Sequence, residues 1–384
     1  IKVNNVNRKI KLKINNDNEI NAYVDDQNII HVNSGLIQYA EDYVALLSVL
    51  AHEIGHIDLN HIGLRKKSVE KNKKYGNLAI LSVIAGSAVT QSPEFLQTSI
   101  VSSAAISNRY IEFSKEQEIE ADLYALNTLS SLNTYSNSII KLLNTIQQRL
   151  LQKGISKNIQ RLSSHPYFED RVSLINNYNK NKKNNINLEL DQRFNFIKAK
   201  FIGYNDNNDQ INYLKEPYKT YAESIRYAKI GNLKKSLENI NEVISISYNS
   251  FIYETKADIL FSYGYTNEAV KFYKMNLENY PLNFYSQIRI FENIDTENMN
   301  KNDIEIIFDK NKDLLFKYFN NKNILLKYLK LATKLDKNEW INFFEFILKI
   351  DQYDKIITDN QISNFKKTRD IDLKKFIAIF EEVT

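Results

Sequence analysis

The sequence predicts a mainly helical α+β protein, with a small β-sheet near the N-terminus and an all-α domain of tetratricopeptide-like (TPR-like) repeats in the second half. Three observations support this fold class. Its 384 residues include only 9 glycines and 4 prolines, so residues that interrupt helices are scarce. Apolar residues recur at three- and four-residue spacing from residue 41 onward. Only residues 1–37 alternate in the way that short strands do.

The composition excludes several classes of function. The chain has no cysteine, which rules out disulfides, Cys-ligated zinc, thiol catalysis and iron–sulfur clusters. Hydrophobic residues make up 43% and charged residues 25%, as in a folded globular protein rather than a disordered one. The net charge of +5 is small and by itself argues neither for nor against nucleic acid. Our prediction is that no nucleic acid is bound.

No segment of the sequence is expected to span a membrane. The longest nearly apolar run, residues 78–90, has about 13 residues, whereas a helix that crosses a bilayer needs about 20. The chain begins with Ile1 rather than methionine. We therefore expect that a signal peptide or N-terminal anchor has been removed.

The predicted elements of the first half are strands followed by helices. The strands are residues 9–14, 21–24 and 29–32, and the helices are residues 46–59, 115–131 and 136–152. Two apolar segments within residues 77–110, rich in Ala and Ser, are predicted to be buried helices. The basic stretch 65–74 reads either as a solvated connector or as a contact for anionic lipid head groups.

A domain boundary is predicted at the polar run NNYNKNKKNNIN, residues 176–187. We expect a first domain over residues 1–178, a linker over 179–187 and a helical domain over 188–384. Two segments of the helical domain share a pattern in which a bulky residue is followed by a glycine, then by a small residue and then by another bulky residue. They are Tyr227, Gly231, Ser236 and Ile240, and then Leu260, Gly264, Ala269 and Tyr273. The two glycines lie 33 residues apart, close to the TPR period of about 34.

One motif dominates the chemistry of the sequence: His52-Glu53-Ile54-Gly55-His56. On a helix, residues i and i+4 share a face, so both imidazoles can bind one metal ion. Glu53 lies about 100° further around the helix, where it can reach a water on the metal and act as general base. The competing interpretation, two surface histidines beside an ordinary glutamate, is disfavoured because apolar residues surround the motif.

A third metal ligand must come from elsewhere in the chain. A metzincin would need glycine at position 59 and histidine at position 62, but the sequence has Leu59 and Ile62. Glu118 and Asp122 share one face of a predicted helix. We expect Glu118 to bind the metal and Asp122 to accept a hydrogen bond from a ligating imidazole. Without the histidines, these acidic residues would read as an ordinary helix N-terminus.

The remaining histidines give weaker signals. His165 precedes a proline, and the residues alone leave open whether it is structural or holds a gate near the metal. His61 follows His56 by five residues and so falls on another face of a continuing helix, which suggests a structural role. His31 lies in a predicted strand without a partner that the sequence identifies.

The blocks LLSVLAHEIGHIDLNH (46–61), SKEQEIEAD (114–122) and SSHPYFEDR (163–171) resemble the metallopeptidase family of HtpX and the CAAX prenyl proteases. NAYV (21–24) and HVNSGLI (31–37) are similar to that family's usual approach to the motif helix. The repeat-like second half makes the chain most similar to the soluble, periplasmic BepA-like branch. The resemblance covers roughly residues 15–290, and it is stronger in the first half.

The resemblance implies a role for each matching residue. His52, His56 and Glu118 would bind one Zn²⁺ per chain, Glu53 would be the catalytic base, and Asp122 would support a ligand from behind. His165 matches the histidine that can reach the zinc and cap it, and Arg171 matches the arginine that follows. Lys115 departs from the family, which usually has arginine there, so the charge is kept but the forked hydrogen bonding is lost.

The implied function is a zinc-dependent endopeptidase of the bacterial cell envelope. It would hydrolyse peptide bonds of misfolded or stalled outer-membrane proteins in the periplasm, and its helical domain would contact the assembly machinery. From the residues, we also expect strand 28–32 to be a sheet edge that pairs with an extended substrate. The alternative is a TPR-type adaptor or chaperone with a silent protease site. A membrane-embedded protease of the HtpX kind would need spanning helices, which the sequence lacks.

Overall fold

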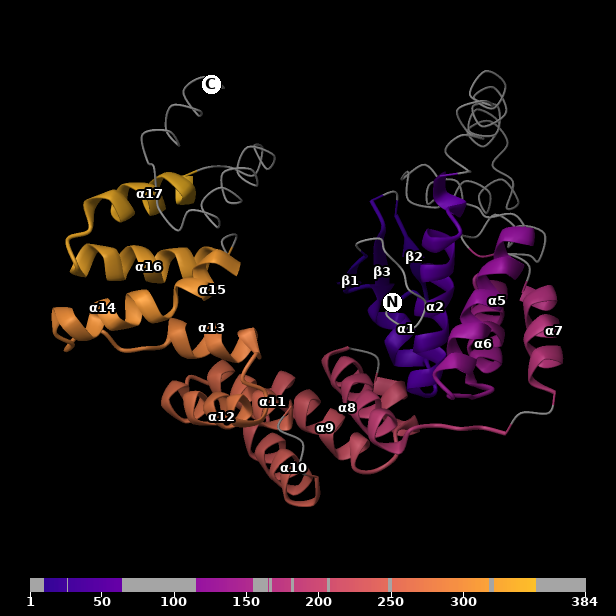
Figure 1. The fold of residues 1–384 in the computed structure, drawn as a ribbon. Coiled ribbons are helices and arrows are strands. Elements are labelled where there is room, and N and C mark those ends of the chain that lie inside the picture. Colours follow the sequence, from indigo (N-terminus) through magenta and orange to yellow (C-terminus); the bar gives the residue numbers. More distant parts are fainter. Residues whose placement is uncertain are drawn as a thin grey trace, which may run out of the picture. The chain divides into compact units, whose positions relative to one another are not determined.

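The computed structural model describes residues 10–25, 27–63, 115–154, 165, 168–180, 183–205, 208–247, 251–317 and 321–349. The predicted basic stretch 65–74 and the two buried helices predicted within 77–110 lie outside the described residues. By its contacts the chain divides into two compact units, Ile1–Ala222 and Glu223–Thr384. The predicted fold class is confirmed, because a small sheet is followed by helices throughout the described part of the chain (Figure 1).

A three-stranded sheet opens unit 1. Its strands are β1 (Lys11–Asn15), β2 (Ala22–Val24) and β3 (Ile29–Asn33), in the order β1-β3-β2. The β2–β3 turn is tight because the Asp25 carboxylate accepts hydrogen bonds from the backbone N–H groups of Gln27 and Ile29, each at 2.9 Å. Asn28 in this turn has a positive φ of 60°.

The expectation that strand 28–32 is a sheet edge is wrong. Strand β3 is central, since it pairs in parallel with β1 and antiparallel with β2. Its backbone groups are therefore used on both sides, and an extended peptide would have to pair with β1 or β2 instead. The sequence pattern predicts that a strand exists, but it does not say which strands flank it.

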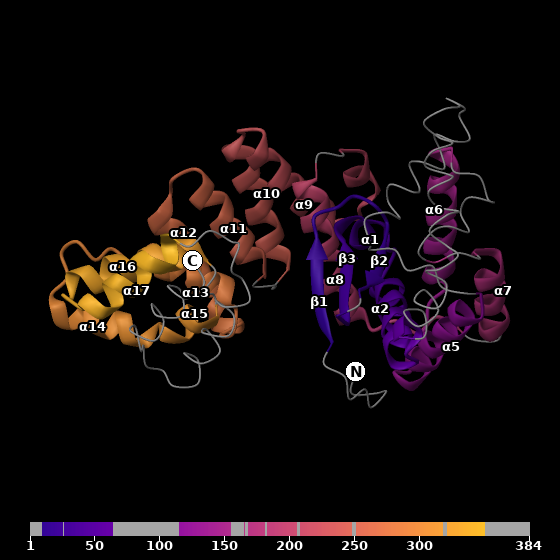
Figure 2. The ribbon, with the colours of Figure 1, turned by 90° about the horizontal axis from the view of Figure 1, so that it is seen from above.

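Unit 1 continues as a series of helices. They are α1 (Ser34–Tyr39), α2 (Tyr43–Asp58), α5 (Lys115–Ser131), α6 (Ser138–Gln152), α7 (Phe168–Asn179), α8 (Leu188–Tyr204) and a 3₁₀ turn, η2 (Asn208–Tyr213). Helix α2 lies between the sheet and α5, as both Figure 1 and Figure 2 show, and it contacts β2 on one side and α5 on the other. The element that carries the His-Glu-His motif is therefore at the centre of this unit.

The start of α2 is fixed by one buried carboxylate. Asp42 caps the helix by accepting a hydrogen bond from the Ala45 backbone N–H at 2.9 Å. The same carboxylate accepts hydrogen bonds from the hydroxyls of Ser136 and Ser138, both at 2.6 Å. Because Ser138 is the first residue of α6 and Ser136 lies two residues before it, a single side chain ties the starts of α2 and α6 together.

Close packing fixes the distance between α2 and α5. Gly55 faces α5, and a Cβ added to it would lie 3.2 Å from the Tyr124 Cβ and 3.3 Å from the Ala121 Cα. A larger residue at either Gly55 or Ala121 would push the helices apart. The sequence places Gly55 beside His56 and Ala121 beside Asp122, so this close contact between the helices is next to the motif residues.

Helix α8 packs onto α1, and Phe194 belongs to the main hydrophobic core of unit 1. The contact-defined division between the units accordingly falls at residues 222–223, within α9 (Tyr218–Lys229). The predicted linker at 179–187 lies earlier in the chain, and its role as a boundary between domains stays a prediction.

Unit 2 is entirely helical in its described part. After the end of α9 it contains α10 (Leu233–Ile246), α11 (Phe251–Ser262), α12 (Thr266–Asn279), α13 (Phe284–Glu292), α14 (Lys301–Lys310), α15 (Lys312–Lys317), α16 (Lys322–Lys334) and α17 (Asn338–Lys349). Around Tyr328, the aromatic rings of Phe291, Phe308 and Phe344 lie 5.0 to 5.8 Å from its centroid and fill the core of this unit.

The two glycines of the repeat pattern end equivalent helices. Gly231 and Gly264 have φ values of +85° and +83°, a region that glycine enters without strain. In both turns the residue after the glycine donates its backbone N–H across the turn, from Asn232 to Tyr227 O at 2.8 Å and from Tyr265 to Leu260 O at 3.0 Å. The two turns are thus built alike, although membership of the TPR repeat class stays a prediction.

Candidate metal centre

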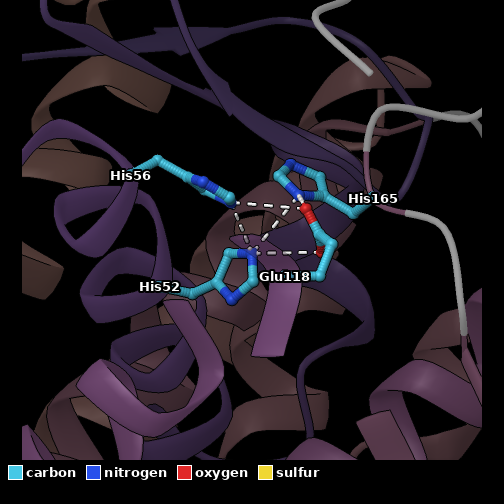
Figure 3. A group of neighbouring side chains, drawn as sticks. All are labelled: His52, His56, Glu118 and His165. Atoms are coloured by element: carbon cyan, nitrogen blue, oxygen red, sulfur yellow. Dashed lines mark hydrogen bonds and ion pairs between the residues drawn. The ribbon is translucent and has the colours of Figure 1, made fainter. Parts of the chain in front are cut away.

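Four side chains from three parts of unit 1 converge on one point (Figure 3). His52 and His56 come from successive turns of α2, Glu118 comes from α5, and His165 comes from the segment before α7. Each offers one ligand atom, and these atoms all lie within 4.8 Å of one another. His56 and Glu118 are fully buried and His52 is 3% exposed, so the centre is shielded from water on these sides.

Five pairs of donor atoms lie 3.0 to 3.5 Å apart. His52 Nε2 lies 3.0 Å from His56 Nε2 and 3.3 Å from His165 Nδ1. Carboxylate oxygens of Glu118 lie 3.5 Å from His52 Nε2, 3.4 Å from His56 Nε2 and 3.2 Å from His165 Nδ1. The three histidine nitrogens and the carboxylate are therefore close enough together to bind one metal ion.

This spacing fits a tetrahedral metal ion. Zinc binds imidazole nitrogen and carboxylate oxygen at about 2.0–2.2 Å, which places neighbouring ligand atoms about 3.4 Å apart. The observed distances of 3.0 to 3.5 Å bracket that value. Two imidazole lone pairs aimed at each other across 3.0 Å would repel without a cation or a proton between them. A donor set of histidine nitrogens and one carboxylate also agrees with the metals that such ligands prefer.

Glu53 lies beside this point and is 1% exposed. One of its oxygens is 3.2 Å from His165 Nε2, and the other has no hydrogen-bond partner among the described residues. Burial raises the pKa of Glu53, but the charge and hydrogen bond of His165 together with the charges of His52 and His56 outweigh burial and hold this pKa below its ordinary value. The side chain is thus an ionised carboxylate with one oxygen available to a further ligand.

Asp122 and Arg171 form hydrogen bonds and ion pairs with the candidate ligands, on the side away from the metal centre. Asp122 accepts a hydrogen bond from His52 Nδ1 at 2.8 Å, as expected from the sequence. Arg171 donates to both oxygens of Asp122, each at 2.7 Å, and its third nitrogen lies 3.1 Å from Glu118. Burial raises the pKa of Asp122, but Arg171 and His52 together lower it to about 2, so this carboxylate stays ionised.

His165 faces two buried carboxylates, Glu53 and Glu118. Burial lowers the pKa of this imidazole, but the two negative charges raise it to about 10. The same electrostatics favour any cation at this place. The centre therefore combines suitable donors with a local field that attracts positive charge.

The structure brings together every site residue that the sequence singled out: His52, Glu53, His56, Glu118, Asp122, His165 and Arg171. Their individual roles stay predictions. Sequence reasoning missed His61, whose Nδ1 lies 3.0 Å from His56 Nδ1, and Glu120, which His61 contacts at 2.9 Å. The only available signal was the closeness of His61 to the motif, and an unbroken helix would have turned it to another face.

Lys115, which stands where the resembled family has arginine, pairs with Asp170 on α7 at 2.9 Å. Both side chains are close to half exposed, so the pair contributes little to stability. The departure from the family pattern therefore does not touch the metal centre.

Comparison with known proteins agrees with this site. The family model described as Peptidase family M48 matches residues 4–179. The beta-barrel assembly-enhancing protease of Escherichia coli O157:H7 is 26% identical over 231 residues, which is 59% of this chain and 46% of that protein. A putative beta-barrel assembly-enhancing protease of Vibrio cholerae is 28% identical over 160 residues, covering 41% of this chain and 32% of that protein. The chain thus spans less than half the length of these relatives.

None of the described helices has both the length and the apolar character that crossing a bilayer requires.

The matched residues include the sheet, α2, α5 and all four candidate ligands, so the family match and the buried centre concern the same part of the chain. Residues 4–179 therefore match peptidase family M48, a family of metallopeptidases, and the similar curated proteins support the same assignment.

Proposed function

We propose that this protein is a zinc-dependent endopeptidase that acts on proteins of the bacterial cell envelope. The observation that carries the proposal is the convergence of His52, His56 and Glu118 on one buried point, with the ionised Glu53 carboxylate beside it. His52, His56 and Glu118 would hold one Zn²⁺ per chain. When bound there, zinc would acidify water and polarise the carbonyl of the scissile peptide.

Glu53 is the general base in this proposal. Its free oxygen would accept a proton from the attacking water, and the resulting carboxylic acid would then donate that proton to the leaving amine nitrogen. Asp122 holds the Nδ1 proton of His52, so that His52 offers its Nε2 lone pair to the centre. Arg171 keeps Asp122 and Glu118 ionised and fixes their positions.

We further propose that His165 keeps the enzyme latent. Its Nδ1 lies 3.3 Å from His52 Nε2 and 3.2 Å from Glu118, so it takes the fourth place in the ligand set. In this place the imidazole would compete with water and substrate for a bound zinc ion. Displacement of His165 from this place would open the centre.

The cellular role is inferred from the relatives, whose names describe proteases that enhance beta-barrel assembly. We propose a periplasmic location and misfolded or stalled outer-membrane proteins as substrates. Unit 2, with its paired helices and glycine turns, would contact the assembly machinery in the way that TPR domains bind partners. The alternative function, an adaptor with a silent protease site, receives no support from the intact ligand set.

A Glu53→Gln variant tests the proposal. Its zinc content and its rate of hydrolysis of unfolded casein are measured and compared with those of the wild type. The variant should bind one zinc per chain like the wild type, because Glu53 is not a ligand, but its cleavage rate should fall by about 10³-fold or more. Glu189→Gln, which changes an exposed carboxylate on α8, is the matched control. Undiminished cleavage by Glu53→Gln would refute the mechanism, and a wild type that binds zinc without cleaving would favour the adaptor.

A further inference from the structure

His61 lies behind one of the candidate ligands because α2 ends early. The helix stops at Asp58, and Asn60 adopts a left-handed conformation with a φ of 58°. The chain therefore departs from the path of α2, and His61 lies against His56 instead of on the opposite face. Its Nδ1 is 3.0 Å from His56 Nδ1, and the residue is 1% exposed.

The contact between the two histidines fixes their protons. His56 directs Nε2 at the candidate metal point, where a ligand atom must carry a lone pair, so the proton of its neutral ring is on Nδ1. That N–H needs an acceptor, and His61 Nδ1 can accept only if the proton of His61 is on Nε2. His56 is therefore protonated on Nδ1, and His61 is protonated on Nε2.

Glu120 completes the chain of hydrogen bonds. His61 Nε2 lies 2.9 Å from Glu120 Oε2, which accepts the remaining proton. The Glu120 side chain is 59% exposed, whereas that of His61 is 2% exposed. The hydrogen bonds from Glu120 to His61 and from His61 to His56 therefore connect the protein surface with the candidate metal centre. In this arrangement each N–H group has one acceptor.

The two histidines of the motif are supported differently. Asp122 accepts directly from His52, whereas the acceptor for His56 is a second imidazole that is itself held by a carboxylate. We propose that His61 is a positioning residue for the metal centre: it orients His56 and fixes its Nδ1–H tautomer, and Glu120 holds His61 in place. The proposal rests on the proposed function, because it assumes that His56 is a zinc ligand.

Two substitutions separate this role from mere filling of space. In His61→Asn the amide oxygen lies near the former position of Nδ1, so an acceptor for His56 remains. In His61→Gln the amide group reaches toward Glu120, so the contact with Glu120 remains while the acceptor near His56 is lost. Zinc affinity, measured by competition with a chromogenic chelator, should fall about 10–100-fold in His61→Gln and only about threefold in His61→Asn.

The zinc measurement is accompanied by the melting temperature of the metal-free protein and the visible spectrum of the Co²⁺ form. His31→Gln is the control, because His31 on β3 pairs with Asp25 and has no contact with the candidate ligands in the described structure. Its zinc affinity should equal that of the wild type. The Co²⁺ spectrum should change in His61→Gln and stay near the wild type in His61→Asn, because it reports the orientation of the ligands.

Equal losses of zinc affinity in both His61 variants, or none in either, would overturn the proposal. Where both variants fail to fold, Glu120→Ala decides, because this side chain is mostly exposed. It should lower zinc affinity about threefold to tenfold, and an unchanged affinity would overturn the proposal as well. A wild type that binds no zinc would instead contradict the proposed function, so the two failures are distinguishable.

Discussion

At the scale of single residues, charge and hydrogen bonding decide what the centre can do. Three carboxylates, Glu53, Glu118 and Asp122, are buried within one small volume. Such a cluster costs free energy unless cations compensate it. Arg171 supplies one positive charge, and His165 or a metal ion supplies more. The arrangement is therefore understandable as a metal site, whereas it would be a poor way to stabilise a fold.

Removal of the cap tests the proposed latency. In His165→Ala the contacts with Glu53 and Glu118 are lost and the fourth position becomes free. We expect cleavage of casein to rise about tenfold, which corresponds to about 1.4 kcal/mol of preference for the capped form. The zinc content should stay at one per chain. An unchanged cleavage rate would remove the latency from the proposal while leaving the peptidase itself in place.

Asp122 is expected to matter for metal affinity rather than for the chemical step. Asp122→Asn removes the charge that Arg171 pairs with and weakens the hold on His52 Nδ1. Zinc affinity should fall about 10–100-fold, while the cleavage rate at saturating zinc should fall much less. Competition with a chelator measures the zinc affinity, and hydrolysis of casein measures the cleavage rate. Asp170→Asn, on an exposed pair with Lys115, should affect neither.

At the scale of elements, the distance between α2 and α5 decides whether His52, His56 and Glu118 meet. This distance depends on Gly55, which contacts Ala121 and Tyr124 directly. The start of α2 is held by Asp42, and the left-handed conformation of Asn60 follows its end at Asp58. The motif helix is thus fixed at both ends and along its face.

Gly55→Val should separate the helices. The added side chain has no room at 3.2–3.3 Å from α5, and overpacking of this kind typically costs about 1–3 kcal/mol. We expect a lower free energy of unfolding in urea and a marked loss of zinc affinity. Ser48→Val, at another buried position of α2, is a comparison in which zinc affinity should fall less. Tight zinc binding by Gly55→Val would show that the helix spacing does not control the centre.

The glycine turns of unit 2 allow a cleaner measurement. A Cβ at Gly264 would meet nothing within 4 Å, so Gly264→Ala changes only the backbone preference at a φ of +83°. This should cost about 1 kcal/mol in the free energy of unfolding, without any change in zinc affinity. Urea denaturation followed by circular dichroism measures the cost. Gly231→Ala should give the same result, because its turn has the same geometry.

At the scale of the whole molecule, the two compact units have separate hydrophobic cores. The core of unit 1 includes Ala45 and Ile57 of α2 and Leu126 of α5, the helices that carry most of the candidate ligands. A large core of unit 2 is centred on Tyr328 and its neighbouring aromatic rings. A ligand that binds between α2 and α5 therefore stabilises the unit that contains them.

Zinc removal should accordingly lower the thermal stability of unit 1. At a free zinc concentration about 1,000 times the dissociation constant, binding adds about 4 kcal/mol to the free energy of unfolding. Differential scanning calorimetry with and without a strong chelator measures this effect. Glu118→Gln, which weakens a fully buried ligand, should reduce the difference between the two scans. A scan unchanged by the chelator would contradict metal binding at this centre.

The sequence by itself determined the features that depend on local geometry. The spacing of His52 and His56 places both on one helix face, and alternation and turn residues predict three strands. The repeat pattern also indicates where Gly231 and Gly264 end their helices. These features follow from the dihedral preferences of neighbouring residues, so a short stretch of sequence suffices to predict them.

Only the tertiary structure decided the features that join distant parts of the chain. It places β3 in the middle of the sheet, packs α8 onto α1 and brings His61 beside His56. Each of these depends on packing or on one left-handed residue, which periodicity does not reveal. Helical periodicity fixes which residues share a face, but contacts between elements fix what that face meets.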